Sequence, residues 1–111
     1  MSGNLFDIPP RPADGELVTD IAAGSGFRVE RIVSWGDVTP NGSWYDQDHD
    51  EWVIVVQGEG TVEDERGGWT RLMPGDAMFL PAHLRHRVVH TSAMPPCIWL
   101  AVHDRLPAAS V

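Results

Sequence analysis

Hydrophobic and polar residues alternate along the chain in short blocks. Val, Ile, Trp and Thr, which suit a pleated surface, gather in segments that recur every ~8–12 residues. No window has the i, i+3, i+4, i+7 apolar spacing of a long amphipathic helix. This rhythm predicts an all-β antiparallel sandwich or barrel. The predicted strands cover residues 16–22, 27–34, 51–57, 61–65, 69–73, 76–80, 86–92 and 97–103.

Turn residues separate these segments. The link ERGGW, residues 65–69, predicts a tight hairpin, because its glycines accept the positive φ that such turns demand. The link MPGD, residues 73–76, predicts a second turn with Pro74 and Gly75 at its centre. The runs WVIVV and IWLAV are apolar on both faces. Since the core covers only one face of an antiparallel sheet, we expect a second subunit to cover the other, in a homodimer.

Length and charge narrow the class of protein. A chain of 111 residues is enough for one domain with one core. The formal net charge of −8 disfavours nucleic acid and anionic membranes as partners. The N-terminal residues lack the basic and apolar regions of a signal peptide, and the single cysteine, Cys97, suits a reducing compartment, so a cytoplasmic protein is predicted. Cys97 itself is expected to be a small buried hydrophobe.

The stretch from Trp44 to Gly60 places acids directly before an apolar strand. A calcium loop is excluded, because its sixth and twelfth positions would be Glu51 and Gln57 in place of Gly and Glu. If the odd-numbered residues of this strand face the core, Glu51 faces it too, and a buried carboxylate needs a partner or a cation.

The residues before Glu51 divide into two sets. Tyr45, Gln47 and His49 share its parity, although a turn over residues 48–50 could break that register. The aspartates are expected to form a solvated rim; they are Asp46, Asp48 and Asp50.

Three histidines occupy the segment PAHLRHRVVH. Val88 and Val89 favour a strand over a helix, and strand alternation predicts that His86, Val88 and His90 point to one face. His83 falls in the preceding turn. His86 is either a metal ligand or a histidine whose hydrogen bonds are satisfied in the core, and the pattern does not decide between them.

Two stretches together resemble the motifs of the cupin superfamily. EWVIVVQG, from Glu51 to Gly58, is similar to the end of its first motif, and GDAMFLPAHLRH, from Gly75 to His86, to the core of its second. The short spacing between them is typical of small single-domain cupins. The resemblance implies a jelly-roll barrel with a metal-accessible pocket over residues 27–103, an N-terminal arm and first strand or strands over 1–26, and a tail over 104–111. The string as a whole resembles a bacterial subfamily without an assigned activity.

The chain departs from this family at several ligand positions. Tyr45 and Gln47 stand where the two histidines of the first motif are expected, His83 replaces a glycine, and His90 replaces the closing asparagine. The resemblance therefore implies a divalent metal, Zn²⁺, Mn²⁺ or Fe, held by Glu51 and His86. The expected further donors are the Gln47 amide oxygen and an imidazole from His49 or His90, whereas Tyr45 would first have to ionise.

Three hypotheses about function remain open at this point. The first is a metal-dependent dioxygenase, isomerase or lyase that acts on a small oxygen-bearing molecule, with Tyr45 or His90 as proton donor or acceptor. The second is a small-ligand-binding or sensing module without metal, favoured by the replaced histidines. The third is a dimeric jelly roll whose pocket is only a remnant.

Overall fold

The chain folds into eight antiparallel strands. The structure is a computed structural model that describes residues 3–107, and this part of the chain contains no helix. Each of the eight predicted segments forms a strand, with small shifts at the ends. The strands are β1 Leu17–Gly24, β2 Phe27–Ser34, β3 Asp50–Gln57, β4 Gly60–Asp64, β5 Trp69–Leu72, β6 Ala77–Leu80, β7 His86–Thr91 and β8 Cys97–Asp104.

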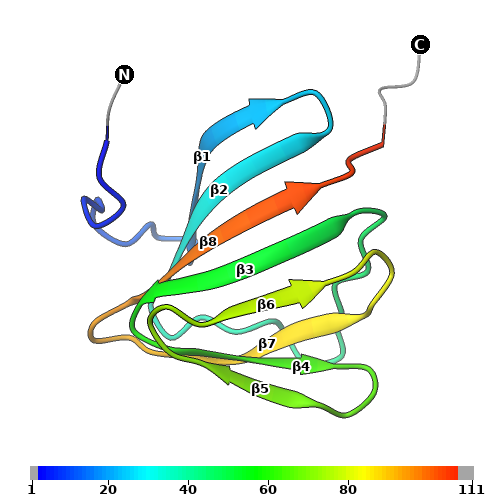
Figure 1. Cartoon of the computed structure of the whole chain (residues 1–111). Coiled ribbons are helices and arrows are strands. Elements are labelled where there is room, and N and C mark those ends of the chain that lie inside the picture. The colour runs from blue at the N-terminus through cyan, green and yellow to red at the C-terminus, as the bar shows by residue number, and fades with distance from the viewer. Residues whose placement is uncertain (1–2, 108–111) are drawn as a thin grey trace.

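The strands form two sheets that enclose the core. The larger sheet has the order β1-β2-β8-β3-β6 and the smaller one the order β5-β4-β7. Figure 1 shows the larger sheet fanning from β1 down to β6, with the smaller sheet beneath it. The core between them follows strict alternation, because successive side chains of a strand point to opposite faces. The buried cluster consists of Val53, Val55, Val62, Leu72, Leu80, Cys97, Trp99 and Ala101.

Two predicted turns and the predicted state of the cysteine are confirmed. Gly67 in the hairpin between β4 and β5 has a φ of 83°, and Gly75 between β5 and β6 has a φ of 92°. Cys97 is fully buried. Burial, with a smaller contribution from the Glu59 carboxylate, raises the pKa of its thiol to about 12, which leaves it an inert packing residue.

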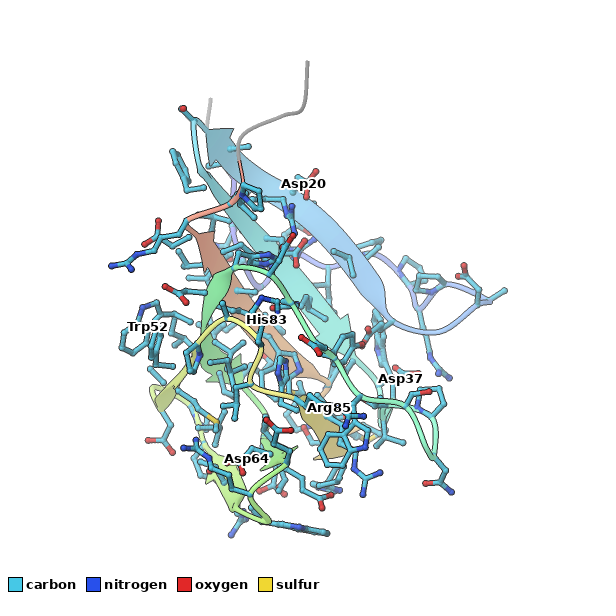
Figure 2. The ribbon with its side chains drawn as sticks, turned by 90° about the vertical axis from the view of Figure 1, so that its right-hand side faces the viewer. Asp20, Asp37, Trp52, Asp64, His83 and Arg85 are labelled. Carbon is cyan, nitrogen blue, oxygen red and sulfur yellow. The ribbon has the colours of Figure 1, made fainter. Side chains whose placement is uncertain are left out.

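The outer face of the larger sheet is partly covered by the N-terminal segment. Arg31 Nη1 donates hydrogen bonds to the carbonyl oxygens of Leu5, at 3.2 Å, and Asp7, at 2.9 Å. Trp52 and Phe79 stay 45% and 41% exposed on adjacent strands, with ring centroids 4.7 Å apart. In Figure 2, Trp52 lies on the opposite side of the molecule from Asp37. The homodimer expected to cover this face stays a prediction.

A bulge in β7 overturns the predicted orientation of His90. Val88 pairs with Val62 of β4, but His90 pairs with Thr61, so Val89 is an extra residue in the ladder. Past this bulge the alternation is reversed, and the His90 side chain is 56% exposed. Its Nε2 lies 3.5 Å from Glu59 Oε1, outside the barrel. His90 therefore does not share a face with His86.

A search of the described residues for a helix that is long and apolar enough to span a bilayer finds none.

Candidate functional site

A cavity of about 420 Å³ opens between the two sheets. Its floor is apolar, with Val53, Leu80 and Trp99, and its wall carries the polar groups. These polar groups come from strands β2, β3, β7 and β8, from the segment before β1 and from the segment between β2 and β3. The polar lining residues are Asp14, Glu16, Glu30, Ser34, Asp37, Thr39, Tyr45, Gln47, Glu51, His86 and His103.

Glu51 and His86 form the centre of the cavity. Both side chains are only 7% exposed, and Glu51 Oε1 lies 3.8 Å from His86 Nε2. The backbone of His86 is also paired with that of Tyr45 in an isolated bridge, at N···O distances of 2.8 and 3.1 Å. A separation of 3.8 Å is too long for a direct hydrogen bond but leaves room for a bound atom to contact both groups.

The Glu51 carboxyl is poised to gain or lose a proton near neutrality. Burial raises its pKa from 4.5 to about 7, and the Glu30 carboxylate adds to the rise. A hydrogen bond from Gln47 and the charge of Arg28 oppose it. Groups whose pKa lies near the working pH are the most effective general acids and bases.

The His86 ring is held in one tautomer. Its Nδ1 lies 3.0 Å from the Leu84 carbonyl oxygen, which can only accept, so Nδ1 carries the hydrogen and Nε2 presents a lone pair toward Glu51. Burial lowers the pKa of His86, against the effect of this hydrogen bond, and keeps the imidazole neutral. The Tyr45 ring stacks on it with centroids 5.5 Å apart.

Tyr45 and Gln47 reach the cavity, as predicted from their parity with Glu51. Burial and the charge of Glu16 raise the pKa of Tyr45, so its hydroxyl stays protonated and can only donate or accept a hydrogen bond. Gln47 contributes its amide beside Glu51. These two residues are thus polar contacts for a bound molecule and not anionic ligands.

His49 does not reach the cavity wall, because the chain bends at residues 48 and 49, just before β3. Its Nδ1 lies 3.2 Å from Asp48 Oδ1 and its Nε2 lies 2.8 Å from His103 Nδ1. His103 Nε2 in turn lies 2.7 Å from Glu30 Oε1. Both ring nitrogens of the two histidines are therefore occupied by protein partners.

His103 and Glu30 are cavity residues that the sequence analysis did not identify. His103 lies on β8 with the parity of the core residues Trp99 and Ala101, and Glu30 lies on β2 with that of Ile32. Strand alternation could therefore have shown that both side chains face inward. It could not have shown that Glu51 on β3 lies directly opposite His103 on β8, because that depends on the register between the two strands.

The loop residue His83, which stands where the second motif has a glycine, adopts a backbone conformation that favours glycine. Its φ is 65°, in the left-handed region that favours glycine. Its amide donates to the Gln47 carbonyl oxygen at 2.7 Å, and its Nδ1 lies 3.0 Å from Asp46 Oδ1. These contacts join the loop before β7 to the segment that carries Gln47. In Figure 2, His83 lies between Trp52 and Asp37.

The described donors do not complete the predicted metal site. Glu51 and His86 converge, but within residues 3–107 no group of three or more His, Cys, Asp or Glu side chains is placed to hold a metal. The expected third imidazole is missing, since His49 is bonded to His103 and His90 points outward. A catalytic zinc site ordinarily has three protein ligands. The donor set is one strong ligand short of that number.

Comparisons with known proteins agree on the fold. A family model described as a cupin domain matches residues 36–103. A crystal structure from Ralstonia eutropha JMP134, provisionally named as a mannose-6-phosphate isomerase, is 41% identical, covers 96% of this chain and 99% of its own, and has a TM-score of 0.89.

More distant structures resemble the chain as well. KdgF from a Halomonas species is 27% identical over 84% of this chain and 82% of its own, with a TM-score of 0.68. A cupin superfamily protein from Desulfitobacterium hafniense DCB-2 is 18% identical over 87% and 83%, with a TM-score of 0.73, and shows the fold alone. Among curated proteins no match was found.

Proposed function

This chain belongs to the cupin domain family, and from that premise we propose that its barrel pocket binds a small oxygen-bearing molecule and isomerises it by proton transfer. The observation that carries the proposal is the Glu51–His86 pair, separated by 3.8 Å and almost fully buried at the centre of the cavity. Buried ionisable groups in a cleft are typical of catalytic sites.

The pair supplies one acid and one base near neutral pH. With its pKa at about 7, Glu51 is protonated in a large fraction of molecules, while His86 is neutral with a free lone pair on Nε2. Glu51 can give its proton to a carbonyl oxygen as His86 takes one from the adjacent carbon. The enediol that forms becomes the isomeric carbonyl compound when His86 gives its proton to the former carbonyl carbon and Glu51 takes the proton of the neighbouring hydroxyl, whose oxygen becomes the new carbonyl. Both residues thus end in the protonation state in which they began.

The other cavity residues position the substrate. The Tyr45 hydroxyl, the Gln47 amide and Thr39 provide hydrogen bonds to hydroxyl groups, and the apolar floor excludes water from the reacting atoms. No step runs through a metal, because the described donors supply only two strong ligands. The isomerase name of the Ralstonia eutropha protein supports the reaction class.

The experiment that tests this function measures carbon-bound hydrogen exchange. The untagged protein is incubated in D₂O, with a metal chelator, with a panel of small aldoses, ketoses and hydroxyketones, and exchange is followed by ¹H NMR. We expect exchange with the wild type and a loss of at least about 100-fold in Glu51→Gln and His86→Gln. His90→Gln, which alters an exposed histidine outside the cavity, is the matched control and retains the rate.

Two results would contradict the proposal. Equal rates of exchange with the wild type and with Glu51→Gln would show that the Glu51–His86 pair does not carry out the proton transfer. Binding of a panel member at the cavity without exchange would instead favour the non-catalytic binding or sensing module.

A further inference from the structure

The cavity is lined by several carboxylic acids and, among the described residues, by no arginine or lysine. Five of its lining residues are carboxylic acids. The sequence has no lysine, so no lysine ammonium can neutralise these carboxylates. The acids are Asp14, Glu16, Glu30, Asp37 and Glu51.

Two of these acids have cationic partners outside the cavity. Asp37 Oδ1 is 2.6 Å from Arg11 Nη2, and Glu30 Oε2 is 3.6 Å from Arg28 Nε. Glu30 is also bonded to His103. These partners offset part of the negative charge, and neither arginine lines the cavity.

Within residues 3–107, neither Glu16 nor Glu51 forms an ion pair with an arginine. Glu16 Oε2 accepts a hydrogen bond from the Ser34 hydroxyl at 3.1 Å, and the neutral Gln47 amide is the polar side chain that lowers the pKa of Glu51. Burial raises the pKa of both carboxyls, and their neighbouring acids raise them further. The negative charges of Glu16 and Glu51 both raise the pKa of the Tyr45 hydroxyl.

We propose that the cavity selects its ligand by charge: it prefers a small hydroxycarbonyl compound that carries a protonated amine, such as an amino sugar, and excludes phosphorylated or carboxylated analogues. This inference rests on the proposed function and names its substrate class. An ammonium group would offset the charge of Glu16 and donate hydrogen bonds to it, while the hydroxyls meet Tyr45 and Gln47. A phosphate would be repelled by the same carboxylates and would find no cation in return.

The size of the preference follows from one partly shielded ion pair. We expect an amine to bind about tenfold more tightly than its neutral analogue, which is the effect of ~1.4 kcal/mol. The phosphate analogue is expected to bind at least about tenfold more weakly than the neutral compound.

Three probes that differ in charge test the proposal: glucosamine, glucose and glucose 6-phosphate. Each is titrated into the wild type with a metal chelator at about pH 6.5, where the amine is protonated. Binding at the cavity is read from the backbone amide resonances of Gln47 and His86. Glu16→Gln keeps a hydrogen-bonding side chain beside Ser34 and removes the charge, so it should reduce the amine preference roughly threefold or more. Glu65→Gln, in the exposed β4–β5 turn, is the control for loss of one carboxylate elsewhere.

The outcomes separate the two proposals. Selection by charge is supported if glucosamine binds most tightly, glucose next and glucose 6-phosphate most weakly, and if Glu16→Gln reduces the preference for glucosamine. Glucose binding without an amine preference, or binding of the phosphate as tightly as glucose, overturns selection by charge and leaves the proposed function standing. No resonance shift with any probe overturns selection by charge, and the deuterium-exchange assay with its wider panel decides the proposed function separately.

Discussion

Replacing Glu51 by Gln should change how the stability of the protein depends on pH. Glutamine has nearly the shape of glutamate and keeps a contact with Gln47, but it does not titrate. The side chain of Glu51 is 7% exposed, so solvent screens its charge little. The substitution therefore isolates the free energy of burying this one ionisable group.

The expected magnitude follows from the pKa of Glu51 in the folded protein, about 7, against its ordinary value of 4.5. Below about pH 4.5 the carboxyl is protonated in both states and contributes nothing. Between pH 4.5 and 7 the unfolded chain releases the proton while the folded chain keeps it, so stability falls as the pH rises and levels off above 7. Each pH unit in this range lowers the free energy of unfolding by ~1.36 kcal/mol, so the total loss of stability is about 3 kcal/mol.

The assay is urea unfolding of the wild type and Glu51→Gln at a series of pH values from about 4 to about 8.5. The free energy of unfolding of the variant, relative to the wild type, should rise by about 3 kcal/mol across this range, which corresponds to roughly 10 °C in Tm. Glu65→Gln controls for the change in net charge. A wild-type-to-variant difference that stays constant within ~1 kcal/mol would refute a buried, neutral Glu51.

Further predictions concern packing and association. A Cβ on Gly60 would lie 2.3 Å from the buried ring of Trp99, so Gly60→Ala should lose about 1–3 kcal/mol in urea unfolding. Gly24→Ala meets only a partly exposed phenylalanine ring that can move, and should cost less than ~1 kcal/mol; equal losses would contradict a rigid core at Trp99. If Trp52 and Phe79 pair two chains, light scattering should give twice 12.2 kDa, and Trp52→Arg should restore 12.2 kDa. A wild type of 12.2 kDa would refute the pairing.

The inward face of β3 was predictable because a strand places alternate residues on opposite sides. Val53 and Val55 are buried, Trp52 is exposed, and Glu51 is carried inward at the start of the strand. The same alternation was wrong for His90, since Val89 forms a bulge there. Valine is an ordinary strand residue, and no turn former marks the position, so the sequence has no sign of this bulge.

Long-range pairing limited the prediction of the cavity. His49 and His103 are 54 residues apart, and their 2.8 Å contact depends on the register between β3 and β8. Alternation assigns a face to each residue but does not say which residue of another strand lies opposite. The imidazole of His49 was therefore assigned to a metal, whereas its partner is a second imidazole.

The two hydrogen bonds from Arg31 to the N-terminal segment determine which sequence changes that segment tolerates. Arg31 binds the carbonyl oxygens of Leu5 and Asp7, and every amino acid supplies a carbonyl oxygen. Residues 5 and 7 can therefore be substituted without loss of these hydrogen bonds. An insertion or deletion between Asp7 and Asp14 would instead shift the cavity-lining acids Asp14 and Glu16 relative to the anchored residues. Length, more than identity, is the property of this segment that selection should preserve.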